Sequence, residues 1–157
     1  MQFRKALRIG LLYEPLIADV VCNDLWPGSI PIRWPAKAVI DFAVVKDGEI
    51  IALLEVKKRF VTSTKYKTTI FQTNKADIAN AVAAYLKVPV LAAVLFNDTL
   101  RLFDLRNTGN RVMITATGRN VAVAHYEYEI NQAVKRDDLA AKIVERLNNA
   151  GNKSNAA

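Results

Sequence analysis

The alternation of apolar and polar positions predicts helices at both ends and in the middle of the chain, with strands between them. Apolar residues recur at helical spacing in residues 3–24, in an Ala-rich stretch at 68–87 and from residue 137 onward. Short runs rich in Val, Ile, Phe and Leu predict strands at residues 37–45, 49–57, 90–96, 100–105, 112–117 and 121–128. This order predicts an α/β fold, in which helices cover the faces of a mixed sheet.

Two features refine this picture of the fold. Pro15 lies inside the first predicted helix, where a proline is expected to kink or divide it. In the predicted middle helix, Phe71, Ile78, Val82 and Leu86 share one side, which we expect to face the core.

The length of the chain favours one domain. It has 157 residues, of which 52% are hydrophobic, so a core can form without disulfides or structural metal. We expect a single domain over residues 1–150 and a disordered tail over residues 151–157.

The N-terminal segment does not indicate export or membrane insertion. Its apolar run is interrupted by Glu14, Pro15 and Asp19, and no stretch approaches the roughly 18 to 20 uncharged residues of a membrane-spanning helix. One cysteine cannot form an intrachain disulfide. We therefore expect a cytoplasmic protein that makes no membrane contact.

The charge balance favours an anionic partner, with nucleic acid as the first candidate. The chain carries 22 Lys and Arg against 15 Asp and Glu, a net charge of +7. Cys22 and His125 are the single residues of their types, which excludes zinc sites built from several Cys and His. No Gly-rich phosphate loop ending in Gly-Lys-Ser/Thr is present. Any catalysis must therefore use carboxylates, lysines or hydroxyls.

Two acids interrupt predicted strands that are otherwise apolar. Asp41 lies in Val39-Ile40-Asp41-Phe42, and Glu55 follows Ile50-Ile51-Ala52-Leu53-Leu54. A buried carboxylate without a partner costs several kcal/mol, so these acids should bind something. Lys57 follows Glu55 by two positions and projects from the same face of the strand.

Whether Asp41 shares that face depends on the loop between the two strands. A three-residue loop at 46–48 pairs Asp41 with Leu53 and places it diagonally beside Glu55. A two-residue turn at 47–48 pairs Asp41 with Leu54 and puts the acids on opposite faces. A shared cation site therefore predicts the three-residue loop.

The spacing of Asp41, thirteen intervening residues and then Glu55-Val56-Lys57 resembles the signature of the PD-(D/E)xK nuclease superfamily. The likeness covers about residues 3–105, and it implies a restriction-endonuclease-like mixed sheet flanked by helices. Within the superfamily, the archaeal-type Holliday junction resolvases and the nuclease domains of type I restriction enzymes look nearest. Ile40 replaces the proline of the name, and Ala76 stands where a tyrosine often follows the helix glutamine.

The resemblance implies a site for Mg²⁺, with Mn²⁺ as the expected substitute. Asp41, Glu55 and the backbone carbonyl of Val56 would supply hard oxygen ligands. Lys57 would orient the attacking water and offset charge in the transition state. Resolvases of the archaeal type carry a glutamate on the first helix, for which Glu14 is the matching candidate. Nuclease domains of the restriction and recombination type often carry a glutamine on the helix after the lysine, which Gln72 matches.

A basic stretch follows the predicted site. Residues 57–75 contain no acid, which suits contact with a phosphate backbone. The predicted nucleic-acid contacts in this stretch, beyond Lys57, are Lys58, Arg59, Lys65, Lys67 and Lys75.

The combined expectation is a Mg²⁺-dependent endonuclease that cuts duplex or branched DNA and works as a homodimer, as resolvases of this kind do. Two alternatives stay open at this point. One is a nucleic-acid-binding module or subunit that keeps the nuclease fold without cleaving. The other is an enzyme that cuts RNA.

Overall fold

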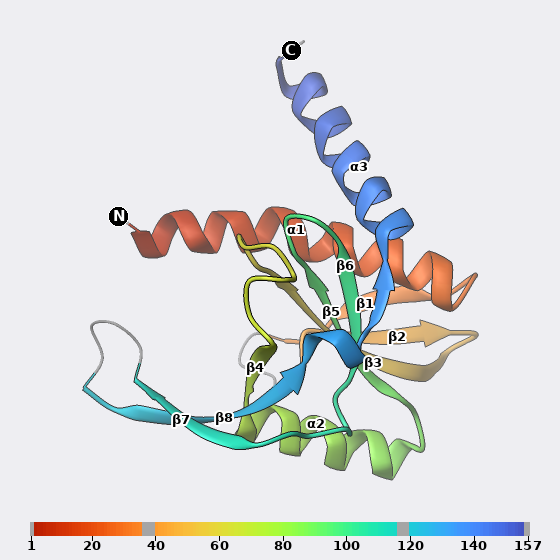
Figure 1. The fold of residues 1–157 in the computed structure, drawn as a ribbon. Helices are drawn as coiled ribbons and strands as arrows, with labels where there is room; N and C mark the ends of the chain where they lie inside the picture. Colours follow the sequence, from red (N-terminus) through yellow and green to blue (C-terminus); the bar gives the residue numbers. More distant parts are fainter. Residues whose placement is uncertain (1, 36–39, 116–119, 156–157) are drawn as a thin grey trace.

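A six-stranded mixed sheet forms the centre of the molecule, and a smaller three-stranded sheet lies beside it (Figure 1). The structure is a computed structural model that describes residues 2–35, 40–115 and 120–155. The larger sheet contains, in spatial order, β1 (Ile30–Arg33), β2 (Phe42–Lys46), β3 (Glu49–Lys58), β5 (Val90–Leu95), β6 (Leu100–Asp104) and β9 (Val134–Arg136). The smaller sheet contains β4 (Thr68–Gln72), β8 (Ala122–Glu129) and β7 (Arg111–Thr115). In the larger sheet β3 and β5 are parallel and the other neighbours are antiparallel.

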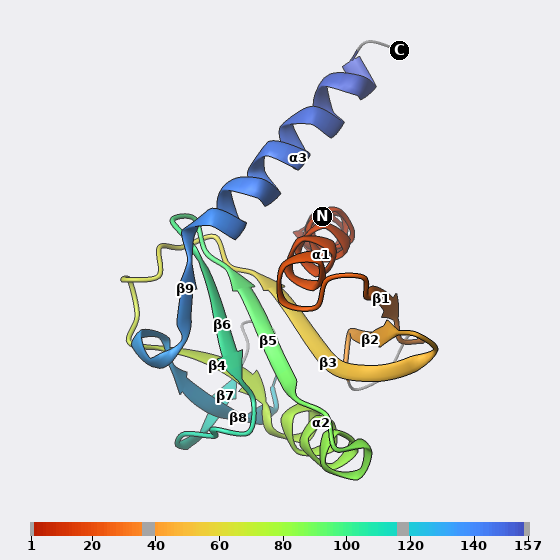
Figure 2. The ribbon, with the colours of Figure 1, turned by 90° about the vertical axis from the view of Figure 1, so that its right-hand side faces the viewer.

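Helices cover both faces of the larger sheet (Figure 2). One face carries α1 (Gln2–Leu25) and α3 (Asp137–Asn155). The C-terminal part of α3 extends away from the sheet in Figures 1 and 2. The other face carries α2 (Thr73–Leu86) and the smaller sheet. A short 3-10 helix, η1 (Ile130–Gln132), connects β8 to β9.

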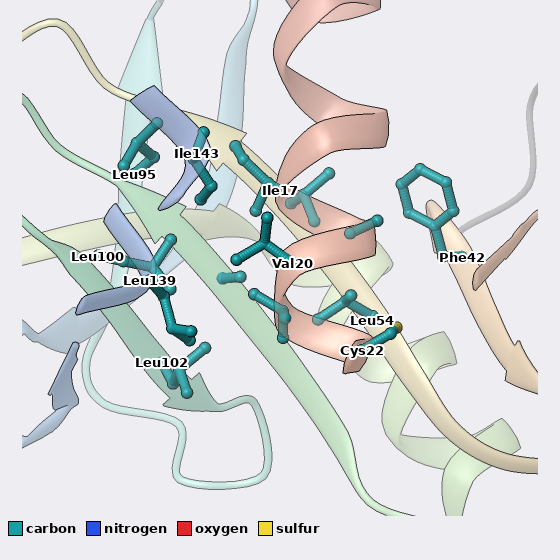
Figure 3. Close-up of a cluster of buried hydrophobic side chains, with 14 of the residues drawn as sticks. Ile17, Val20, Cys22, Phe42, Leu54, Leu95, Leu100, Leu102, Leu139 and Ile143 are labelled. Atoms are coloured by element: carbon teal, nitrogen blue, oxygen red, sulfur yellow. The ribbon is translucent and has the colours of Figure 1, made fainter. Parts of the chain in front are cut away.

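The two cores follow from the alternation of side chains along β3. Ala52, Leu54 and Val56 point to the α1 and α3 face, where they pack against Ile17 and other residues of that core (Figure 3). Leu53 points to the opposite face and packs in the core under α2. Two positions further along β3, Glu55 lies on the same face as Leu53. The strand therefore delivers an acid to a face that is otherwise apolar.

Most of the predicted elements are confirmed. The first helix is one continuous helix, so Pro15 does not divide it. The predicted strands 49–57, 90–96 and 100–105 correspond to β3, β5 and β6. The predicted strand 37–45 is observed as β2 from Phe42, whereas residues 37–39 lie outside the described residues. The hairpin predicted at 112–117 and 121–128 forms as β7 and β8, and residues 116–117 lie outside the described ones.

The predicted helix at 68–87 is wrong at its beginning. Residues 68–72 form β4, which pairs with β8. Phe71 packs edge-on against the rings of Phe103 and Tyr128, so tertiary burial favours the strand for a segment rich in β-branched and aromatic residues. The helix begins at Thr73 instead.

The buried side of this helix also differs from the prediction. Ala76, Ala79 and Ala83 face the core, whereas Ile78 and Leu86 are exposed. The small alanine side chains let the helix approach the sheet closely, so the larger apolar residues are left toward solvent.

The C-terminal elements extend further than predicted. The short strand β9 and the helix η1 were not predicted, because each contains only three residues and carries no periodic signal. Helix α3 continues through Asn155, so residues 151–155, where disorder was predicted, are helical in the structure. Within the described residues, no helix combines the length and apolar character that crossing a lipid bilayer requires.

Candidate active site

The β2–β3 hairpin brings the two predicted acids together by a route that differs from the expected one. Its turn is the two-residue loop Asp47-Gly48, with Lys46 paired to Glu49, so the predicted three-residue loop is wrong. Both turn residues have positive φ, 52° and 79°, as the tight hairpin turn that suits twisted strands requires.

A β-bulge corrects the register. Val45 pairs with Ile50, but Val44 pairs with Ala52, so Ile51 is the extra residue of β3. After the bulge Phe42 pairs with Leu54, and the next two positions, Asp41 and Glu55, lie opposite each other. The acids therefore share a face, as the site hypothesis required, although the loop has an even number of residues.

Asp41 and Glu55 are tied together through the backbone. The Asp41 N–H donates a hydrogen bond to Glu55 Oε2 at 3.2 Å, and the Val56 N–H donates to Asp41 Oδ2 at 3.0 Å. Glu55 is buried, with 5% of its surface exposed. Across the described residues, neither acid has a Lys, Arg or His partner within ion-pair distance. The site therefore concentrates negative charge without a direct counter-charge.

Lys57 is held by β4 rather than by the two acids. Its Nζ donates to the carbonyl oxygen of Ile70 at 3.3 Å and lies 4.2 Å from the centre of the Phe71 ring. This pairing of a cation with an aromatic face and a carbonyl fixes the end of a flexible side chain. Strand β4, which was predicted as part of a helix, therefore positions the candidate catalytic lysine.

Burial shifts the pKa of two groups in the site. Burial, and then the neighbouring Asp41 charge, raises the pKa of Glu55 from 4.5 to about 8. Burial, and then the nearby Arg59, lowers the pKa of Lys57 from 10.5 to about 8. Both shifts disfavour the charged forms, and an added cation beside the carboxylates would favour the ionised acid again.

The acids open into a pocket of about 360 Å³ at the end of β3. The predicted site residues that line it are Glu14, Asp41, Glu55, Val56, Lys57, Lys58, Arg59 and Lys75. Glu14 reaches the pocket from α1 while it pairs with Arg33 at 2.9 Å. Gln72, Lys65 and Lys67 do not line the pocket. The first of these lies at the end of β4, where it pairs with His125 of β8.

Two aromatic residues of the pocket were not predicted. Tyr13 from α1 and Phe60 after β3 complete its wall, and their rings meet edge-on with centres 6.3 Å apart. The position of Tyr13 depends on where α1 crosses the sheet, which no local sequence signal encodes.

The predicted basic contacts fall into two groups. Lys58 and Arg59 are half-buried and bound within the protein: Lys58 Nζ donates to Asn97 Oδ1 at 2.8 Å, and Arg59 Nη2 donates to the Ile70 carbonyl at 3.4 Å. Lys65, Lys67 and Lys75 are exposed. The second group is therefore the one available to an external polyanion.

The residues of the site fit a hard divalent cation. Two adjacent carboxylates without ion-pair partners provide oxygen ligands, and Val56 lines the same pocket with its backbone. Among residues described by the structure, no group of three or more His, Cys, Asp or Glu is arranged to hold a metal. An ion here would accordingly take its other ligands from the main chain, water or substrate, as Mg²⁺ usually does.

Comparisons with known proteins agree with this geometry. A protein-family model described as "Phage putative PDDEXK endonuclease" matches residues 31–122. Among solved structures, the fold is similar to that of Hjc, a Holliday junction resolvase from the archaeal hyperthermophile Archaeoglobus fulgidus. That similarity has a TM-score of 0.51 at 12% sequence identity, and it covers 84% of this chain and 95% of the other.

These matches confirm the predicted resemblance and the predicted fold class. At 12% identity the likeness to the resolvase concerns the fold alone. No curated protein sequence matches the chain.

Proposed function

This chain belongs to the PDDEXK endonuclease family, and on that basis we propose that it is a divalent-metal-dependent endonuclease that hydrolyses phosphodiester bonds in DNA. The observation that carries the proposal is the pair of carboxylates, Asp41 and Glu55, each held by a backbone N–H and both lining one pocket together with Lys57. We assign Mg²⁺ as the cofactor, with Mn²⁺ as a substitute, because the donors are oxygen atoms.

Each residue has a role in this mechanism. Asp41, Glu55 and the Val56 carbonyl would hold the ion, which when bound polarises the scissile phosphate and acidifies water. Hydrolysis forms a bond between a water oxygen and phosphorus and breaks one ester P–O bond; the water gives up a proton to solvent, and the leaving oxygen takes up a proton from solvent. Lys57 Nζ, fixed by Ile70 and Phe71, orients the attacking water and offsets the charge that develops on the phosphate. Glu14 contributes to the wall of the pocket, whereas Gln72 does not line the pocket and has no direct role in this mechanism.

Removing either acid tests the catalytic proposal. We expect Asp41→Ala and Glu55→Ala to abolish Mg²⁺-dependent cleavage of labelled DNA and to leave DNA binding largely intact, because both acids act on the ion rather than on the phosphate backbone. Glu49→Ala is the matched control, since Glu49 is an exposed acid at the other end of β3. Cleavage by the two variants at the wild-type rate would contradict the proposal.

The same assay identifies the substrate class. A panel of single strands, duplex, flaps, four-way junctions and the corresponding RNAs separates a branched-DNA nuclease from a duplex-cutting enzyme or a ribonuclease. Salt-sensitive binding of DNA that ignores both Mg²⁺ and the acids would instead indicate a non-catalytic module.

We also propose that the protein works as a homodimer. One pair of acids facing one pocket gives a single chain one proposed cleavage centre, whereas two symmetric cuts in a duplex or junction need two centres. Light scattering at working concentration should give about twice 17.5 kDa. A mass of one chain, with full cleavage of both strands, would contradict this.

A further inference from the structure

A second pocket, here called the apolar pocket, adjoins the candidate active site. It has a volume of about 530 Å³ and lies between the chain that follows β3 and the smaller sheet. Its walls include Phe60, Tyr66, Ile70, Ile114 and Ile130. Nothing in the catalytic mechanism uses it.

The two pockets share a wall. Arg59 and Phe60 line both of them. Ile70 lines the apolar pocket, and its carbonyl oxygen accepts hydrogen bonds from Lys57 Nζ at 3.3 Å and from Arg59 Nη2 at 3.4 Å. A group in the apolar pocket would therefore contact Ile70, the same residue whose carbonyl oxygen holds Lys57.

The chemistry of the apolar pocket suits a flat, apolar group that is attached to negative charge. Phe60 and Tyr66 leave 59% and 58% of their surfaces exposed, which is unusual for aromatic side chains. Lys65 Nζ lies 5.4 Å from the centre of the Tyr66 ring, and Arg59 lines the pocket as well. Aromatic faces bordered by cations are the features with which proteins stack and hold single nucleobases.

We propose that the apolar pocket binds one unpaired nucleobase of the DNA substrate, next to the phosphate that is cut. This inference rests on the proposed function and narrows its substrate class. A base inside an intact duplex is stacked and cannot enter without being extruded, which costs a few kcal/mol and least where the base is unpaired. The preferred substrates are therefore DNAs with an unpaired base beside the cleavage point.

Binding to three matched duplexes tests this inference. Each carries a fluorescent label and differs at one internal position, which holds one extra unpaired adenine, one extra abasic residue or no extra residue. Fluorescence anisotropy in the presence of EDTA measures affinity without metal-dependent cleavage. We expect the wild-type protein to bind the unpaired adenine more tightly than either of the other two duplexes.

Tyr66→Ala should weaken binding of the unpaired-adenine duplex by roughly 5- to 150-fold, as loss of one stacking partner does, and change binding of the fully paired duplex by less than about twofold. Tyr66→Phe keeps the ring and should bind as the wild type does. Tyr85→Ala is the matched control, because Tyr85 is 86% exposed on α2 and does not line the pocket.

Two results would overturn the inference. Equal wild-type affinity for the three duplexes, or equal behaviour of the Tyr66→Ala and Tyr85→Ala variants, would show that no base occupies the pocket while leaving the endonuclease proposal standing. Absence of binding to all three duplexes would also overturn this inference, whereas the endonuclease proposal is decided separately by the cleavage assay on the substrate panel.

Discussion

Glu55 is placed where its charge is costly to the folded protein. It is buried beside Asp41, and the pKa of its carboxyl is raised from 4.5 to about 8 by burial first and by Asp41 second. The folded protein thus holds a proton up to about pH 8 that the unfolded chain releases near pH 4.5. The stability contributed by this group is present below pH 4.5 and is lost as the pH rises to 8. Lys57 has the opposite effect: because its pKa is lowered from 10.5 to about 8, its contribution to the stability of the folded protein increases as the pH rises from about 8 to 10.5.

The Glu55→Gln substitution should therefore stabilise the metal-free protein in a pH-dependent way. At pH 8 we expect a rise in Tm of about 3 to 6 °C, because a neutral amide replaces a carboxyl that the folded protein keeps protonated and the unfolded chain ionises, whereas at pH 5 the change should be small. Thermal unfolding in EDTA at both pH values measures it. Glu49→Gln is the control, and an equal gain for Glu55→Gln at pH 5 and pH 8 would contradict the electrostatic explanation.

At the residue scale, the sequence predicted the acids and the lysine because a charge inside an apolar run is visible without any structure. It did not predict Tyr13, Arg33 or Phe60 as neighbours of the site. Tyr13 reaches the site where α1 packs over β3, and Arg33 reaches it through its ion pair with Glu14 of α1. The placement of α1 depends on the packing of the whole core rather than on local residue types.

The β2–β3 hairpin places both acids on one face through a two-residue turn combined with a β-bulge, a combination that was not predicted. Asp-Gly is a typical signal for a two-residue turn, and the structure has that turn. The bulge at Ile51 restores the register, yet no residue type at that position demands a bulge. That Asp41 and Glu55 lie on the same face of the sheet could therefore be predicted from the site hypothesis. The combination of a two-residue turn and a β-bulge that puts them there could not.

Gly48→Ala tests the contribution of the turn. Gly48 has φ of +79°, where an alanine side chain is strained, so we expect a loss of about 1 kcal/mol in the free energy of unfolding. Urea denaturation measures this loss. Gly151→Ala is the matched control: it lies in α3 with no heavy atom within 4 Å of the added carbon, and alanine favours the helix. Destabilisation by both substitutions to the same extent would contradict the role of φ.

For the whole molecule, the predicted order of helices and strands was sufficient to identify the mixed sheet with helices on both faces. The main errors concern one strand in each sheet: β4 of the smaller sheet was assigned to a helix, and β9 of the larger sheet was missed. Both strands are short and gain their stability from partners distant in the sequence, β8 for one and β6 for the other. Periodicity within a short segment cannot report such long-range pairing.

The exposed lysines should determine how binding of DNA depends on salt. We expect Lys65→Ala, Lys67→Ala and Lys75→Ala each to weaken binding similarly for all DNA sequences and to reduce the slope of log affinity against log salt by about one. Anisotropy titrations across a range of NaCl concentrations measure the slope. Lys46→Ala, exposed at the distant end of the hairpin, is the control and should leave the slope unchanged. A slope that all four variants leave unchanged would contradict the assignment.

The contacts that hold Lys57 mean that the proposed catalytic hairpin cannot be transferred as an isolated unit. Its two acids are organised by contacts between their own strands, but its ammonium group depends on Ile70 and Phe71 from a strand of the other sheet. A graft of the hairpin into a new scaffold would transfer the two acids proposed to bind the ion. It would leave the Lys57 side chain without its contacts and free to change conformation in solvent. The smallest segment that contains both acids and the residues that hold Lys57 runs from Asp41 to the end of β4, about thirty residues. A transfer must also supply the elements against which this segment packs.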